Sequence, residues 1–169
     1  MRSIISTVSP ECLGERVAAM GVGAPSSGTW PALLDAIFVP FSLVTEFVIR
    51  AAFVANGGAV NGSWDIGVYD AFVQRVFSTG AILQGGVSAV QIENVSPHLL
   101  RPGDYYLMMS NSSGTSQVLR STLATASAAQ VIGLGRFSTA FVLPLRLSLG
   151  PFTTTYLPHF GLMGDRRVW

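Results

Sequence analysis

Two short segments, each flanked by turn-forming residues, most constrain how this chain can fold. Residues 64–70 read WDIGVYD and follow Asn61-Gly62, and residues 102–109 read PGDYYLMM and open with their own Pro-Gly turn. Apolar and aromatic runs bounded by Asn-Gly and Pro-Gly are typical of antiparallel β-strands. The two segments therefore predict two strands of an antiparallel β-sandwich.

The alternation within the first segment predicts which side chains face the core. Successive side chains of a strand point to opposite faces of the sheet. We therefore expect Trp64, Ile66 and Val68 inside the sandwich, and Asp65 and Tyr69 on its outer surface.

Strand patterns recur at regular spacing through the rest of the chain. Residues 36–43 and 46–54 form a predicted pair, and both faces of the second strand are mostly apolar, as in a central strand or one covered by a partner. One of these faces carries Phe47, Ile49, Ala51 and Phe53. Further strands are expected at residues 74–78, 87–95, 104–110, 140–149 and 153–160.

The segments between these strands complete the predicted fold. Residues 96–103 contain two prolines and indicate a loop, and residues 121–132 indicate a short helix or an irregular crossing. About eight short strands without a long helix predict an all-β fold, an antiparallel β-sandwich of jelly-roll-like type.

The first 31 residues differ from the rest because they are rich in glycine and proline and lack clean strand alternation. They predict an irregular N-terminal arm or linker, with one or two helical turns between Glu11 and Met20 and a linker ending at Gly28. Residues 32–169 are then the β-sandwich domain with its C-terminal tail. Two alternatives stay open for the arm, which either packs on a neighbouring subunit or is disordered.

Composition bears on the partners of this chain. Charged residues make up only 11% of its 169 residues, against roughly 25% in ordinary soluble domains, which indicates a surface largely covered by partners. A membrane is not the expected partner, since Pro40, Glu46 and Arg50 interrupt the most apolar stretch, 36–55. Nucleic acid is not expected either, because the arginines form no basic stripe. The N-terminal apolar run is too short for a secretion signal.

Catalytic and metal chemistry have little support in the sequence. The two histidines lack clustered partners, and the single cysteine, Cys12, has no nearby histidine. Asp65, Asp70 and Asp104 could converge on Ca²⁺, but acids beside turns usually cap those turns. Asp65 and Asp104 are also the suspects for a glycosidase pair, a third-ranked possibility. We therefore expect no enzyme activity, no metal and no cofactor.

Several aromatic residues are candidates for contacts with a partner. Tyr69, Tyr105 and Tyr106 could stack on sugar rings, although an aromatic in an alternating strand is more often part of the core. Subunit or partner contacts are expected at five positions, Cys12, Trp30, Tyr156, Phe160 and Trp169.

Four motifs together resemble a group of tailed-bacteriophage minor structural proteins. They are FVPFSL at 38–43, FVANGGAVNGSWDIGVYDA at 53–71, STG at 78–80 and RPGDYYLMM at 101–109. The β-sandwich domains of that group end in an aromatic-proline segment similar to TTTYLPHFGL at 153–162. The resemblance spans roughly residues 38–162.

The resemblance implies a virion component assembled in the host cytoplasm. Such a protein oligomerises, as a trimer, on the capsid or tail as a decoration or cement, fibre or adaptor protein. Its implied partners are its own copies and the major capsid or tail proteins. The alternative is a carbohydrate-binding domain that recognises a glycan on the host surface.

Overall fold

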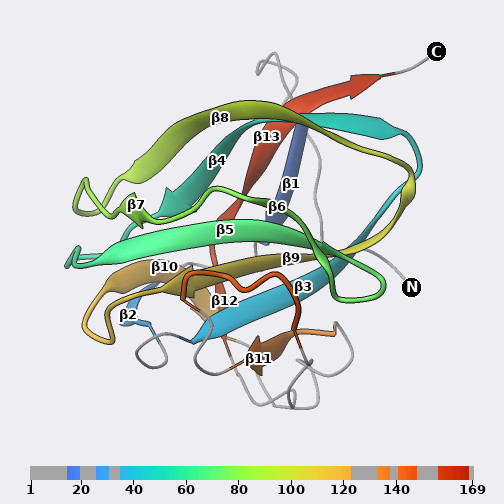
Figure 1. Ribbon diagram of the computed structural model, residues 1–169. Helices are drawn as coiled ribbons and strands as arrows, with labels where there is room; N and C mark the ends of the chain where they lie inside the picture. Colours follow the sequence, from blue (N-terminus) through green and yellow to red (C-terminus); the bar gives the residue numbers. More distant parts are fainter. Residues whose placement is uncertain are drawn as a thin grey trace.

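The computed structural model describes residues 15–19, 26–30, 35–122, 133–137, 141–147 and 156–167. These residues form thirteen strands and no helix, and the strands pair antiparallel (Figure 1). The predicted all-β, antiparallel fold is therefore confirmed. The strands outnumber the eight expected, partly because some are very short, such as β7 (Ile82–Leu83) and β12 (Tyr156–Pro158). No helix in the described ranges is long and apolar enough to cross a membrane.

One face of the sandwich is a four-stranded sheet with the order β1-β13-β4-β8. Its strands are β1 (Glu15–Ala19), β13 (Phe160–Arg167), β4 (Glu46–Ala55) and β8 (Val90–Leu100). The strand nearest the C-terminus therefore lies inside the sheet, and β8 forms one edge.

The other face is a six-stranded sheet with the order β11-β3-β9-β5-β6, and β7 also pairs with β5. Its remaining strands are β11 (Gly135–Phe137), β3 (Ala36–Leu43), β9 (Gly103–Asn111), β5 (Ser63–Asp70) and β6 (Arg75–Ser78). A third, three-stranded sheet has β10 (Gln117–Thr122) between β12 and β2 (Ser26–Thr29). A bridge between Asn56 and Val118 links β10 to the end of β4.

The main core is built from inward side chains of all three sheets. Trp64, Ile66 and Val68 are fully buried in it, as their alternation predicts. On β4 the predicted face is correct only up to Ile49, because Arg50 is an extra residue against β13, where Ile49 pairs with Gly164 and Ala51 pairs with the adjacent Met163. Beyond that bulge the core residues of β4 are Ala52 and Val54 instead of Ala51 and Phe53.

Asp65 and Tyr69 lie on the outer face of the six-stranded sheet, as predicted, but this face is not open to solvent there. Both are fully buried, because residues 141–147, here called the strap, cross the outer face of the six-stranded sheet. Tyr69 donates a hydrogen bond of 2.6 Å to the Pro144 carbonyl, and Leu143 packs in a second hydrophobic cluster with Tyr69. The strap is not the strand predicted at 140–149. Among the described residues, its one strand-type pairing is an isolated bridge between Gln74 and Arg146.

Other boundaries also depart from the predictions. Within the expected N-terminal arm, β1 and β2 are strands that pair with β13 and β10, so those stretches are neither helical turns nor linker. The predicted loop at 96–103 is mostly strand, since β8 continues to Leu100. Residues 117–122 form β10, which was not predicted, and residues 123–132 lie outside the described ranges.

Candidate functional site

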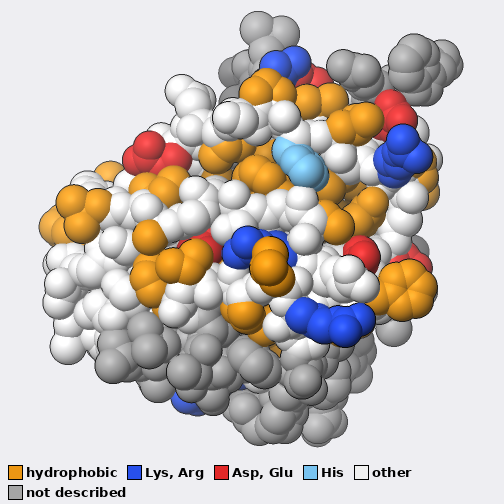
Figure 2. Space-filling view, in the orientation of Figure 1, with side chains coloured by type: hydrophobic (Ala, Val, Ile, Leu, Met, Phe, Trp, Pro, Cys, Tyr) orange, Lys and Arg blue, Asp and Glu red, His pale blue; other side chains and the backbone are white. Residues whose placement is uncertain are grey.

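A groove with a volume of about 840 Å³ opens between the edges of the two main sheets. One wall is β6 with the turn that follows it, the other is the Asn94–His98 part of β8, and Val142 and Leu145 of the strap lie at its margin. Figure 2 shows this face, with hydrophobic side chains gathered in its upper half over β8 and β6. The groove is the candidate site because it exposes both apolar and hydrogen-bonding groups.

A bulge in β8 shapes one wall of the groove. Ile49 pairs with His98 and Ala51 pairs with Asn94, so three residues of β8 oppose the single Arg50 of β4. Bulges bend a strand and redirect its side chains. Here Val95 packs against the core, and the His98 ring lies against Phe77 of β6 with a centroid separation of 5.5 Å.

The buried Asp65 carboxylate lies behind the β6 wall. Its oxygens accept hydrogen bonds from Ser78 Oγ at 2.8 Å, Thr79 Oγ1 at 3.1 Å and the Leu143 amide at 3.0 Å. Burial raises the pKa of Asp65, and these hydrogen bonds and the Arg75 charge oppose the rise. Arg75 also donates to the Leu143 carbonyl. Because Asp65 is fully enclosed and its oxygens have partners, it anchors the strap and is not placed to act on a substrate.

The two acids suspected as a glycosidase pair are far apart. On β5 and β9, Asp65 pairs with Ser110 and Asp70 pairs with Tyr105, so Asp104 lies one position beyond that end. Six positions along a strand correspond to about 20 Å, whereas the two carboxyl groups of glycosidases lie within about 10 Å of each other. Asp65 and Asp104 therefore do not form such a pair.

The proposed calcium ligands are also not brought together. The Asp70 carboxylate accepts hydrogen bonds of 2.9 Å from the amides of Phe72 and Gln74, which is the turn capping expected of it. Asp104 is exposed and accepts a hydrogen bond from Ser42. Within the described ranges, no group of three or more His, Cys, Asp or Glu side chains is placed to hold a metal ion.

The three tyrosines considered for sugar stacking do not share one platform. Tyr69 is buried beneath the strap. Tyr105 stacks on Phe41, and Tyr106 packs edge-on against Phe38. Neighbouring residues of a strand point to opposite faces, so Tyr105 and Tyr106 cannot line one surface.

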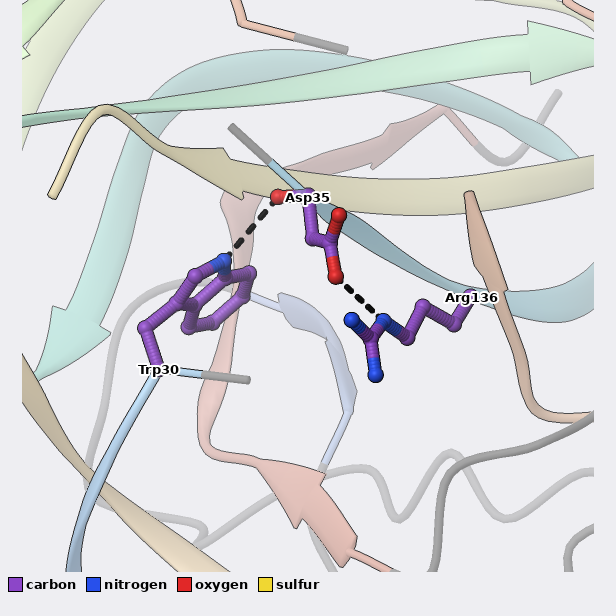
Figure 3. A network of polar contacts seen from close by, with 3 residues as sticks. All are labelled: Trp30, Asp35 and Arg136. Atoms are coloured by element: carbon purple, nitrogen blue, oxygen red, sulfur yellow. Dashed lines mark hydrogen bonds and ion pairs between the residues drawn. The ribbon is translucent and has the colours of Figure 1, made fainter. Parts of the chain in front are cut away.

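Two of the expected partner contacts are core residues. Trp30 is buried and donates a 2.9 Å hydrogen bond from Nε1 to the Asp35 carbonyl, while the Asp35 carboxylate forms an ion pair with Arg136 (Figure 3). Phe160 is also fully buried. Tyr156 begins β12, where it pairs with Thr122, and Cys12 and Trp169 lie outside the described residues.

A buried polar network lies beside the N-terminal end of β8, at the opposite end of this strand from the groove. Sequence patterns did not reveal this network. Gln84 Nε2 donates to Asn56 Oδ1 at 2.7 Å, and Gln91 Oε1 accepts from Trp64 Nε1 at 3.1 Å. Gln84 Oε1 also accepts from Asn111. Amides spread over four separate segments of the chain carry no periodic signal, so only the tertiary structure brings them together.

Exposed apolar residues concentrate on the side of the groove and β8. Of the nine large hydrophobic residues exposed in the described ranges, seven lie on β7, on β8 and the turn before it, or on the strap: Leu83, Val87, Val90, Ile92, Leu99, Val142 and Leu145. On β8, Val90 and Ile92 share one face and are more exposed than Gln91 and Glu93 on the other. Such a surface is suited to binding another protein.

Comparison with protein-family models found no matching family, and comparisons with the curated proteins and with the solved structures found no match.

Proposed function

We propose that the protein is a structural subunit of a bacteriophage virion that assembles with its own copies on the capsid or tail. The observation that carries the proposal is the apolar side formed by β8, the turn before it and the strap, where Val90 and Ile92 are 59% and 53% exposed. Exposed apolar side chains that gather in one part of a surface mark sites of contact with other proteins. Contact with other subunits would remove these side chains from solvent.

Three further features support an assembly role. Only 11% of the residues are charged, and the ion pair between Arg50 and Asp165 lies on the surface. Asp65, the buried acid beside the groove, is engaged in the hydrogen bonds that hold the strap. The motif resemblance to phage minor structural proteins points to the same role and implies a trimer.

Sedimentation of the purified protein and analysis of virions test the proposal together. We expect a sedimenting mass that is a multiple of 17.9 kDa at micromolar concentration, and we expect the protein to be detected by mass spectrometry in purified virions and located on their surface by cryo-electron microscopy. A protein that stays monomeric and is absent from particles would overturn the proposal.

A further inference from the structure

We propose that β8 pairs with β8 of a second copy, antiparallel about a twofold axis at Ile92. The two four-stranded sheets would then continue into one eight-stranded sheet. This inference rests on the proposed function, because it names how two subunits join; with the trimer that the resemblance implies, the pairing would join two trimers into an even number of copies.

The first half of β8 has an open hydrogen-bonding edge. The strand lies at the end of its sheet, at the rim of the molecule in Figure 1, and pairs with β4 on one side. The Asn56 amide donates to the Ala89 carbonyl at 2.9 Å, so Ala89 directs its carbonyl toward β4. Backbone groups alternate in direction along a strand, so those of Val90, Ile92 and Asn94 point away from β4. An open row of this kind is a template for another strand.

The two halves of β8 differ in how they are protected against pairing. The second half carries the bulge and Pro97, which are common protections of edge strands. The first half, Val90–Asn94, has no proline, and its one charged residue is Glu93, which accepts a 2.9 Å hydrogen bond from Gln91. The first half is therefore the part of this edge that can accept a partner strand.

The sequence of this half is complementary to itself. A twofold axis at Ile92 places Ile92 opposite its copy, Val90 opposite Asn94 and Gln91 opposite Glu93. The residues with outward backbone groups then form the hydrogen-bonded pairs, and each carboxylate faces an amide that already donates to a carboxylate within its own chain. Moving the axis to Glu93 would place two negative charges opposite each other, which disfavours that register.

The side chains on the outer face of β8 favour the same arrangement. Ile92 pairs with Phe53 and Val90 pairs with Ala55, so each exposed residue continues an apolar row of β4. Strand pairing places the Val90 and Ile92 side chains of both copies next to each other on one surface. Leu83, whose carbonyl accepts from Gln91 Nε2, adds an exposed apolar side chain at the start of the strand.

Sedimentation of two lysine variants tests the contact. The wild-type protein should sediment at an even multiple of 17.9 kDa, and Ile92→Lys should halve that mass, because two positive charges would then meet at the axis. Val44→Lys is the matched control, since Val44 is a β-branched residue 84% exposed in the turn between β3 and β4. It should keep the wild-type mass.

An odd oligomer, or an Ile92→Lys variant of unchanged mass, would overturn the twofold contact and leave the proposed function standing. A monomeric wild type would overturn both.

A cysteine variant tests the register of the strand pair. Its result is the formation of a covalent bond, so it does not depend on the loss of a contact. Cα atoms of a hydrogen-bonded antiparallel pair lie about 5.5 Å apart, within the range that a disulfide spans. In a Cys12→Ser background, Ile92→Cys should form a covalent dimer under mild oxidation, seen on a non-reducing gel. Val44→Cys in the same background should stay uncrosslinked. Failure of Ile92→Cys to crosslink, or equal crosslinking of both variants, would contradict the axis at Ile92.

Discussion

At the scale of single residues, Asp65 couples the outer face of the sheet to the strap. Its carboxylate receives hydrogen bonds from β6, from the turn after it and from the strap, at the cost of removing a charge from water. The alternation of β5 correctly separated Asp65 from the main core. It gave no sign of the strap, because a strand's own pattern says which face a residue occupies and not what later chain covers that face.

The pKa of Asp65 predicts how stability depends on pH. Burial raises this pKa above the value of about 3.9 in the unfolded chain, so the folded protein holds the proton more tightly. The stabilising effect of this proton is complete below about pH 4 and is lost as the pH rises through the folded pKa, by at most about 1.4 kcal/mol per pH unit. Urea unfolding from pH 4 to 7 should show the wild type losing stability relative to Asp65→Asn.

The exposed Asp104 provides the control for that measurement, since Asp104→Asn removes a carboxylate outside the strap contact. A wild type that keeps or gains stability relative to Asp65→Asn as the pH rises would show that burial does not dominate the energetics of this carboxylate.

Gln84 is the residue on which the buried polar network most depends. Gln84→Ala would leave Asn56, Asn111 and Ser116 without a shared partner in a site that excludes water. Unsatisfied buried polar groups cost about 1–3 kcal/mol each, so we expect a loss of about 2–4 kcal/mol in the free energy of unfolding, measured by urea denaturation. Gln74→Ala, at an exposed position, should change it by less than about 0.5 kcal/mol. Equal losses in the two variants would rule out a special role for the network.

At the scale of elements, strand periodicity succeeded where one strand stays regular. The bounds predicted for β3, Ala36–Leu43, are those observed, and β4 differs by one residue at its end. Arg50, an extra residue on β4 opposite β13, reversed the predicted face of β4 beyond it, because one extra residue shifts the alternation. The groove wall arises from the bulge of β8 opposite the same residue, so neither that bulge nor the groove could be read from the periodicity of β8.

The strap packs closely on β5 because position 67 has no side chain. A Cβ at Gly67 would lie 2.8 Å from Leu143 Cδ1 and 2.9 Å from the Phe77 carbonyl oxygen. Gly67→Ala should therefore displace the strap and lower the free energy of unfolding by about 1–3 kcal/mol. Gly85→Ala is the control, because a Cβ there would meet no atom within 4 Å. Thermal unfolding followed by circular dichroism measures both, and an unchanged midpoint for Gly67→Ala would show that the strap is not held against β5.

At the scale of the whole molecule, segments far apart in the sequence join the sheets. β1 pairs with β13 and β2 pairs with β10, so stretches of the expected arm complete two sheets. Short strands with weak alternation gain stability mainly from such tertiary pairing, which explains why β1, β2 and β10 were not predicted locally. The apolar character of both faces of β4, by contrast, follows directly from its sequence, and β4 is a central strand, one of the two alternatives that this character left open.

His159 lies where the three-stranded and four-stranded sheets meet, between β12 and β13. Its amide donates to the Leu119 carbonyl, its carbonyl accepts from Ala55, and its ring lies 2.8 Å from Ser121 Oγ. Burial lowers the pKa of this imidazole, so the folded protein keeps the ring neutral. The unfolded chain takes up a proton below about pH 6.5, and stability should therefore fall as the pH drops through that value, by at most about 1.4 kcal/mol per pH unit.

Substitution of each histidine in turn separates the pH dependence of stability due to His159 from that due to other groups. Unfolding free energies of the wild type and His159→Gln, measured from pH 7.5 to 5, should differ by an amount that shrinks or reverses as the pH falls, because glutamine does not titrate. His98→Gln, in the groove wall, replaces the chain's other histidine and should keep the wild-type decline. If His159→Gln kept the full decline and His98→Gln lost it, the acid sensitivity would belong to the groove and not to the junction of the sheets.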